Sequence, residues 1–116
     1  MAKYSRELLS ASTDGRAIVI AATATPGTLI HTAAVVGVLD EVWLWVANSG
    51  ALTNITLEWG GVGAANQMTT TYPVAASSAA LLLVPGFVLT NGLTVRAFVA
   101  NANRLNVAGY VNRYTP

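Results

Sequence analysis

The clearest pattern of polar and apolar positions lies in the middle of the chain. Residues 54–59 alternate without a break, with apolar side chains on one face and polar side chains on the other. Because successive side chains of a strand point to opposite faces, this alternation predicts a half-buried strand. Residues 42–47 are apolar on both faces and are followed by turn residues at 48–50. We therefore expect the two runs to pair as an antiparallel hairpin.

Short apolar runs separated by turn residues continue on both sides of this centre. Before it, residues 16–22 and 28–34 are expected to be strands joined by a turn at Pro26-Gly27. After it, Asn91-Gly92 is the strongest short hairpin signal in the chain. The strands expected after the centre are 68–76, confined to a sheet edge by Pro73, then 79–84 and 87–89, separated by Pro85-Gly86, then 93–100 and 104–113.

These runs amount to about seven or eight short strands without a helical period, which predicts an all-β fold. We expect a single antiparallel β-sandwich of jelly-roll-like kind, because 116 residues suit one hydrophobic core. The sandwich is expected to span residues 14–116. Residues 1–13 are expected to form an N-terminal arm, with one helical turn around residues 6–9, that stays mobile unless something holds it.

The chain carries unusually few charges. Asp, Glu, Lys and Arg make up 9% of the residues, against about 25% in typical soluble domains. A surface this poor in charge suggests that a membrane or another protein covers part of it. The uncharged residues 17–39 include Pro26, Gly27 and many β-branched side chains, which favour strands over a spanning helix. We therefore expect a protein neighbour and no membrane segment.

Two further features limit the location and the partners. The N-terminal residues include Lys3, Arg6 and Glu7 and lack the apolar run of a secretory signal, so the chain is expected to be made in the cytoplasm and to remain there after synthesis. A net charge of +1 gives no basic field that would attract nucleic acid. The expected partners are therefore proteins.

The side chains available for catalysis are few, with one histidine, five carboxylates and no cysteine. The sequence therefore predicts no catalytic residue, no cofactor and no metal ligand. His31 could act as a general base only if a distant serine and aspartate converged on it, and is otherwise a partly buried strand residue with a hydrogen-bonded ring nitrogen. Asp40 and Glu41 are adjacent at the start of an expected strand, where they are expected to form a solvated turn. Because their side chains point to opposite faces, they are not expected to chelate a metal together.

Trp43 and Trp45 lie two positions apart and share one face of their expected strand, opposite an aliphatic face. Two arrangements are open. Either the aliphatic face lies in the core and the tryptophans meet a partner subunit, or the tryptophans fill the core and the aliphatic face is covered elsewhere. A platform that stacks sugars is a further alternative, although such a platform normally includes carboxylates and amides.

Several segments of strands and turns carry a family resemblance, namely residues 40–48, 56–61, 84–86, 89–93, 95–98 and 109–113. Together they resemble small virion proteins of tailed bacteriophages, which are typically encoded among the head genes. The resemblance implies a capsid decoration or cement protein that binds the outer surface of the phage head, commonly near a symmetry axis. It also implies the major capsid protein as partner, a homo-oligomer that is sometimes a trimer, and a location on the virion.

The candidate protein interface combines the N-terminal arm with the two tryptophans, and its residues are Lys3, Tyr4, Arg6, Leu8, Leu9, Trp43 and Trp45. We expect residues 1–12 to act as a strap that contacts the shell or an adjacent copy. The alternative function is a glycan-binding module of a tail fibre or head fibre, in which Trp43 and Trp45 face outward. An enzyme would need His31.

Overall fold

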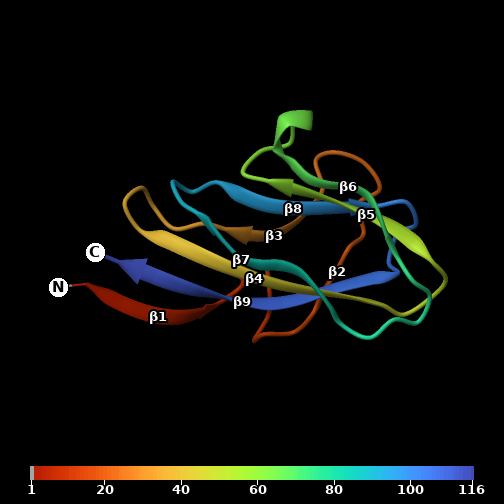
Figure 1. Ribbon diagram of the computed structural model, residues 1–116, viewed down its shortest axis with the longest axis horizontal. Helices are drawn as coiled ribbons and strands as arrows, with labels where there is room; N and C mark the ends of the chain where they lie inside the picture. Colours follow the sequence, from red (N-terminus) through yellow and green to blue (C-terminus); the bar gives the residue numbers. More distant parts are fainter. Residues whose placement is uncertain (1) are drawn as a thin grey trace.

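A computed structural model describes residues 2–116 and shows two antiparallel sheets packed face to face (Figure 1). Sheet A contains β1 (Lys3–Leu8), β2 (Ile18–Val19), β4 (Leu39–Asn48), β7 (Leu81–Leu89) and β9 (Leu105–Thr115). Sheet B contains β3 (Thr28–Thr32), β5 (Thr53–Trp59), β6 (Gln67–Val74) and β8 (Thr94–Val99), and a 3₁₀ helix, η1 (Ala64–Asn66), precedes β6.

The strand order is that of a jelly roll. Sheet A runs β1-β9-β4-β7, with β2 pairing a separate part of β9, and sheet B runs β3-β8-β5-β6. Within the described residues, every connection except β1–β2 and β5–β6 carries the chain from one sheet to the other. When β1 and β2 are taken as two parts of one strand, each sheet has four strands, as in an eight-stranded jelly roll. The predicted all-β sandwich is confirmed.

The predicted hairpin between residues 42–47 and 54–59 is wrong. These runs are β4 and β5, but β4 pairs with β7 and β9 in sheet A, whereas β5 pairs with β6 and β8 in sheet B. Asn48 secures the crossing, because its side-chain nitrogen lies 2.9–3.1 Å from the carbonyl oxygens of Ala51, Val74 and Ala75. The turn residues mark the end of β4, but contacts distant in sequence decide which sheet the chain enters next.

The Asn91-Gly92 turn forms, but it also joins the two sheets instead of closing a hairpin. Both residues have positive φ, 63° and 66°, and the amide of Leu93 donates to the carbonyl of Thr90 at 3.3 Å. The strands on either side, β7 and β8, belong to sheets A and B respectively. The local turn chemistry was therefore predicted correctly and its role in the fold was not.

Several strands differ in extent from the prediction, and β7, β2 and β3 differ most in kind. β7 is continuous across Pro85-Gly86, where a bulge shifts its register against β4 and Gly86 takes a φ of 82°. Proline is tolerated there because β7 is the edge strand of sheet A. β2 covers two of the residues expected at 16–22, and β3 ends at Thr32. β6 contains Pro73 and lies at the edge of sheet B, as predicted.

The helical turn predicted near residues 6–9 is also wrong. Residues 3–8 form β1, which pairs with β9 at six consecutive positions. Just beyond it, the Leu9 side chain is 1% exposed in the core, and the amide of Ala11 donates to the carbonyl of Ile30. A strand is more stable than a helical turn at these residues because it also pairs with backbone groups of β9, which a helical turn would leave unpaired. Residues 3–11 of the expected arm are thus held against the sandwich, and Met1 lies outside the described residues.

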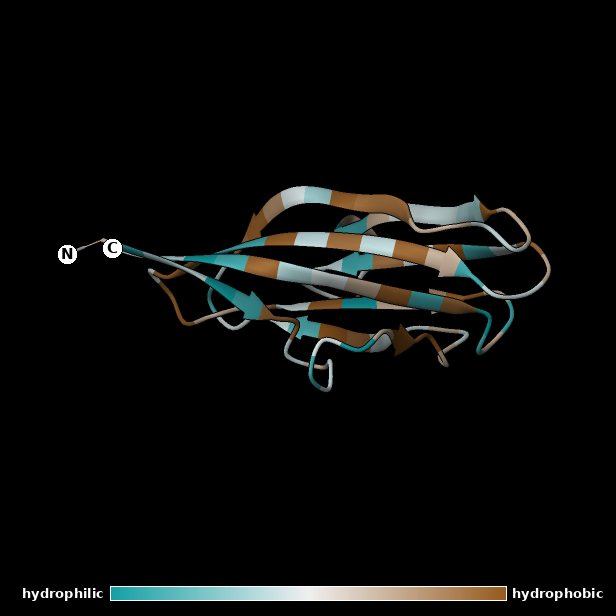
Figure 2. Cartoon of the chain, turned by 90° about the horizontal axis from the view of Figure 1, so that it is seen from below, coloured by the Kyte–Doolittle hydropathy of each residue, from teal (hydrophilic) through white to brown (hydrophobic). Residues whose placement is uncertain are grey.

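The core lies between the sheets and takes alternate residues from each strand. Figure 2 shows the result as hydrophobic and hydrophilic bands that alternate along the strands. In β4, Val42, Leu44 and Val46 are fully buried, and burial of each such side chain contributes roughly 1.5–3 kcal/mol. The accessible surface is 5953 Å², close to the roughly 6,000 Å² expected of a folded monomer of this mass. The aliphatic face of β4 is therefore the inward one, which turns the tryptophans outward.

Candidate interaction surface

Three aromatic side chains stand together on the outer face of sheet A. Trp43 and Trp45 come from β4, and Tyr110 is the residue of β9 opposite Trp43. Their ring centroids are 5.9–6.4 Å apart, and all three residues are half-buried. The indole of Trp43 lies over Gly86 of β7, where an added Cβ would come within 2.8 Å of Cζ2. The absence of a side chain at Gly86 therefore sets the position of Trp43.

Polar groups line one end of this aromatic cluster. Glu41 Oε1 accepts hydrogen bonds from Trp43 Nε1 at 2.7 Å and from Asn112 Nδ2 at 3.1 Å. These bonds, that from Trp43 first, hold the pKa of Glu41 below its ordinary value. The guanidinium of Arg6 lies 4.5 Å from the centre of the Tyr110 ring and donates to Asn112 Oδ1 at 3.4 Å. A carboxylate, an amide and a guanidinium thus adjoin the aromatic cluster.

An open groove of about 500 Å³ runs over this polar end, and its lining residues are Tyr4, Ser5, Arg6, Glu41 and Asn112. A second hollow of about 330 Å³ adjoins it and adds Leu39, Val88 and Tyr114 to the lining. Tyr4 and Tyr114 are in contact, with ring centroids 4.8 Å apart. The groove is therefore lined mainly by polar side chains, whereas the adjoining hollow adds aliphatic and aromatic ones.

Exposed apolar residues extend the cluster across all four long strands of sheet A. These residues pair with outward-facing residues of the neighbouring strands, so they lie on the same face of the sheet. They are Tyr4, Leu8, Leu39, Leu82 and Val88. Tyr4 is 78% exposed, the largest value among the exposed large hydrophobic residues described. We call this set, together with Arg6, Glu41, Trp43, Trp45, Tyr110, Asn112 and Tyr114, the outer face of sheet A. Such contiguous apolar surface is typical of interaction sites.

The outer side of sheet B is partly covered by the chain itself. Glu58 is fully buried there, and its carboxylate accepts hydrogen bonds from the amide of Gly27, at 2.7 Å, and from the hydroxyl of Thr25. Gly27 packs so closely on β8 that an added Cβ would lie 2.5 Å from the Ala97 carbonyl. The loop around Pro26 therefore shields this sheet, whereas the outer face of sheet A stays open.

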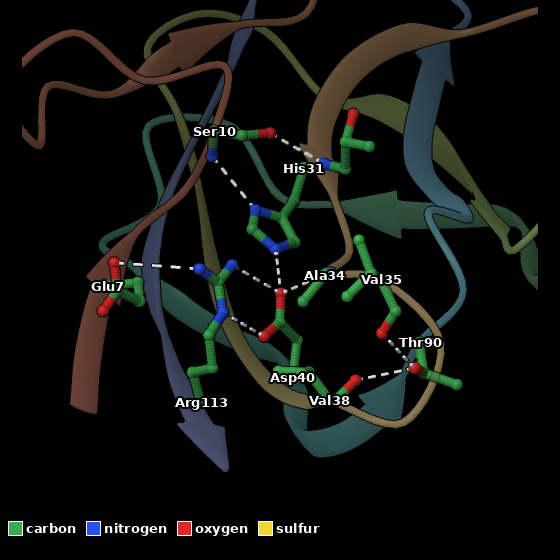
Figure 3. A network of polar contacts seen from close by, with 10 residues as sticks. Glu7, Ser10, His31, Ala34, Val35, Val38, Asp40, Thr90 and Arg113 are labelled. Atoms are coloured by element: carbon green, nitrogen blue, oxygen red, sulfur yellow. Dashed lines mark hydrogen bonds and ion pairs between the residues drawn. The ribbon is translucent and has the colours of Figure 1, made fainter. Parts of the chain in front are cut away.

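His31 lies in a buried polar cluster between the sheets (Figure 3). Its Nδ1 accepts a hydrogen bond from the backbone amide of Ser10 at 3.0 Å, and its Nε2 lies 2.8 Å from Asp40 Oδ2. Because the amide can only donate, Nδ1 carries no proton and Nε2 donates to the carboxylate. His31 is 1% exposed and Asp40 is fully buried. The imidazole is therefore neutral, with both nitrogens engaged.

Arg113 completes this cluster from β9. Its Nε and Nη2 donate to Asp40 at 2.8 and 3.1 Å, and the amide of Ala34 also donates to Asp40 at 3.1 Å. Burial raises the pKa of Asp40, but the hydrogen bonds from Arg113 and His31 outweigh it and leave the pKa below its ordinary value. The carboxylate of Asp40 thus joins β3 of sheet B to β4 and β9 of sheet A.

The arrangement around His31 lacks the geometry of a nucleophilic triad. Ser10 and Asp40 do converge on the ring, but Ser10 contacts it through the backbone, and the Ser10 hydroxyl accepts instead from the Thr32 amide at 2.7 Å. No lone pair of the imidazole is available to deprotonate the hydroxyl. Asp40 and Glu41 point to opposite faces of β4, as predicted, with Asp40 inward. The solvated turn expected at these two residues is wrong, because Asp40 is fully buried by its contacts with His31 and Arg113. Within residues 2–116, no group of three acidic, histidine or cysteine side chains could hold a metal.

The structure brings most of the predicted interface residues onto one surface. Tyr4, Arg6 and Leu8 lie beside the two tryptophans on the outer face of sheet A, while Lys3 is exposed on the other side of β1. Leu9 belongs to the core, so its predicted place in an interface is wrong: it follows the end of β1, where the chain turns inward.

Sequence reasoning missed the contributions of Glu41, Tyr110 and Asn112 to this surface. The signal was present for two of them, because the apolar residues Leu105, Val107 and Val111 fall on one face of the last expected strand, 104–113. Residues on the opposite face of that strand are by implication outward, and Tyr110 and Asn112 are among them. Their place beside Trp43 depends on the pairing of β4 with β9, which the sequence does not show.

The fold and this surface define a jelly-roll domain with one open, aromatic-rich sheet face. No known family model, no curated protein and no solved structure matches the chain. Across the described residues, no helix has the length and apolar character to span a membrane.

Proposed function

We propose that this chain is a structural protein that acts by binding other protein subunits, as a decoration or cement protein on the outer surface of a tailed-phage head. The observation that carries the proposal is the outer face of sheet A, with Trp43, Trp45 and Tyr110 at its centre. The choice of a phage head rests on the family resemblance of the sequence. The major capsid protein is the proposed partner, and the virion surface is the proposed location.

The composition of this face suits a protein interface. Interface centres are enriched in tryptophan, tyrosine and arginine and depleted in lysine and acidic residues. The outer face of sheet A has two tryptophans, three tyrosines and one arginine, and Glu41 is its one acidic member. Both charged side chains already have hydrogen-bond partners in the fold, and Arg6 also lies over the Tyr110 ring, so a partner can cover them without leaving either group unbonded.

The size of the face is also suitable. The four long strands contain 6, 9, 10 and 11 residues. At about 3.3 Å per residue and about 4.8 Å between strands, they cover a footprint of about 600 Å². A standard interface takes about 800 Å² of accessible surface from each partner. The face of a single copy therefore supplies most of the area of one standard contact, and the low overall charge lets neighbouring surface supply the rest.

A catalytic role is not part of this proposal. The one histidine is buried with both ring nitrogens hydrogen-bonded, and the open groove on sheet A contains a single carboxylate, that of Glu41. Acid–base and nucleophilic chemistry generally need two or more such groups close together. The groove is better suited to recognition than to reaction.

The test is occupancy on particles. Purified shells lacking this protein are mixed with the wild-type chain or with Trp45→Ala, sedimented, and the bound fraction measured over a range of concentrations. Loss of a central tryptophan is expected to weaken binding by about 2 kcal/mol, or about thirtyfold. Tyr72→Ala, which removes an exposed aromatic residue of sheet B, is the matched control and should bind as wild type. Failure of the wild-type chain to bind shells, or equal binding of Trp45→Ala, would refute the proposal.

A second candidate is favoured by the groove beside the aromatic cluster. Sugar-binding sites combine aromatic faces with carboxylate and amide groups, and here Glu41 and Asn112 adjoin Trp43. In this case the chain is the glycan-binding module of a tail fibre or head fibre. Trp45→Ala would then abolish adsorption of the phage to its host while particle assembly stays intact, whereas a decoration protein would show the reverse.

A further inference from the structure

The edges of the two sheets differ in how well they are protected against pairing with another chain. β7 contains Pro85 and two register shifts, and β6 contains Pro73 and two register shifts. The outer edge of β3 is occupied by residues 10 and 11, which bond to the backbone of Thr32 and Ile30. Irregularities and covering segments of this kind are the usual protection of edge strands.

Within the described residues, β1 lacks prolines, bulges and a covering segment, and its protection is limited to the charged side chains Lys3, Arg6 and Glu7. It is paired with β9 at six consecutive positions, has no proline and no bulge, and no described strand pairs with its other side. Figure 1 shows it along the margin of the sandwich, next to the C-terminal half of β9. An edge strand with regular backbone exposes unpaired amide and carbonyl groups that can extend the sheet into another chain.

We propose that β1 pairs antiparallel with β1 of a second copy, about a two-fold axis that passes between the Ser5 residues of the two chains. Such a closed, two-fold pairing requires one residue of the strand to lie opposite its own copy, because directly opposed side chains share a face. Because β1 is short, three registers pair its central part with the second copy, and they are centred on Tyr4, Ser5 or Arg6.

Charge separates these registers. Centring on Arg6 places two guanidinium groups directly opposite each other, which is destabilising. Centring on Tyr4 places Arg6 opposite Ala2 and pairs no charges. Centring on Ser5 places Lys3 opposite Glu7 of the second copy, and this pair occurs twice by symmetry. Glu7 Oε1 also lies 3.9 Å from Arg113 Nη1 of its own chain, so Lys3 would add a second cation to a partly exposed carboxylate. Opposite charges across paired strands are stabilising, so the register centred on Ser5 is favoured.

The same register joins Tyr4 to Arg6 of the second copy on the outer face. Tyr4 is 78% exposed, and the guanidinium of Arg6 already lies over Tyr110. In the dimer, one face of the guanidinium meets Tyr110 of its own chain and the other meets Tyr4 of the second copy. Arginine stacked on aromatic rings in this way contributes a cation–π attraction.

Pairing along β1 would also enlarge the interaction surface. A two-fold axis perpendicular to the sheet keeps both outer faces on the same side, so the two copies of sheet A become one sheet of eight long strands. The aromatic clusters of both copies then face the same partner. The dimer does not depend on the proposed capsid role, since it follows from the strand edge and its charges alone.

A disulfide test addresses the register directly. The chain has no cysteine, so Ser5→Cys introduces a single thiol at the proposed axis. Directly opposed residues of antiparallel strands have Cα atoms roughly 4.5–5.5 Å apart, within the range of a disulfide. Mild oxidation of the full chain is expected to yield a covalent dimer on non-reducing gels. Ala24→Cys, an exposed thiol on the loop over sheet B, is the control and should stay monomeric.

A charge-reversal test addresses the energetics. Sedimentation equilibrium is expected to show a reversible dimer for the wild-type chain, about tenfold weaker in Lys3→Glu or Glu7→Lys because two ion pairs become repulsive. The double variant with both changes should recover wild-type association, and Arg16→Glu, an equal charge change at an exposed site outside β1, should have no effect. A wild-type chain that is monomeric at all concentrations, a Ser5→Cys variant that dimerises without forming the disulfide, or no recovery in the double variant would each overturn the proposal.

Discussion

Asp40 is the residue on which the buried polar contacts of this chain converge. Its carboxylate accepts from Arg113, from the amide of Ala34 and from His31, and it lies where β3, β4 and β9 come together. The side chain is fully buried, so an ionised Asp40 is tolerated only because each oxygen has a donor. The stability of the folded sandwich should therefore depend on the ionisation of Asp40, and so on pH.

The pH dependence follows from the lowered pKa of Asp40. A carboxyl group whose pKa is lower in the folded state stabilises the fold at pH values above its unfolded pKa, near 3.8, and loses that contribution as the pH falls through the folded value. Asp40→Asn removes a buried ion-pair partner and is expected to cost about 3 kcal/mol near neutral pH. Urea unfolding measured across the acid range should show that this difference between wild type and variant shrinks as the pH is lowered.

The control for this measurement is Asp14→Asn, at an exposed turn position where asparagine tolerates the positive φ of 55°. It should change stability by no more than about 0.5 kcal/mol. A difference between wild type and Asp40→Asn that stays constant with pH would contradict the assigned role of the Asp40 carboxylate.

At the scale of the elements, β7 shows how an edge strand passes through residues that normally end a strand. Pro85-Gly86 forms a bulge, and the bulge leaves room above Gly86 for the indole of Trp43. The strand and the aromatic cluster thus depend on each other. A side chain at position 86 would clash with the indole of Trp43, which donates to Glu41 and lies beside Trp45 and Tyr110.

Gly86→Ala tests this dependence. The substitution is expected to destabilise the fold by about 2 kcal/mol, because it combines a strained positive φ with a clash against Trp43. The near-ultraviolet circular dichroism of the tryptophans should change as well. Gly92→Ala carries the same backbone strain with open space around it, so it is the matched control. Equal effects of the two substitutions on stability and on the tryptophan signal would contradict the contact.

At the scale of the whole molecule, the sandwich presents one shielded sheet and one open sheet. Sheet B is covered in part by the loop that buries Glu58, whereas the outer face of sheet A carries the aromatic cluster, the groove and the β1 edge. Two separate interactions can therefore use sheet A together. The face can bind a partner, and the edge can bring a second face into the same plane.

This arrangement predicts avidity. If the dimer is the form that binds shells, Lys3→Glu should lower occupancy of the shells at limiting protein concentration. The variant is a monomer under these conditions, so its face binds without the help of a second face in the same dimer. Arg16→Glu should leave occupancy unchanged, and cross-linked Ser5→Cys dimers should bind at least as well as wild type. Occupancy of Lys3→Glu equal to wild type, under conditions where its dimer is dissociated, would show that single copies bind.

The alternation of polar and apolar residues was sufficient to predict the all-β sandwich, the strands at residues 42–47, 54–59 and 104–113, and the edge position of Pro73. The inward face of the last strand was also readable, since Leu105 and Val107 recur with period two. These features are local, because a strand shows its two faces in its own sequence. The low content of charged residues was likewise evident from the sequence alone.

Only the tertiary structure decided how the strands pair and which residues meet. The turn residues after Ala47 and at Asn91-Gly92 predicted hairpins, yet both turns carry the chain between sheets. Pairing of β4 with β9 placed Tyr110 beside Trp43, and packing of β3 on β4 placed His31 beside Asp40. Each of these two pairs joins residues of different strands, so their contact depends on the fold as a whole. Sequence patterns of short range determine strands, whereas the free energy of burying two whole sheets against each other determines their order.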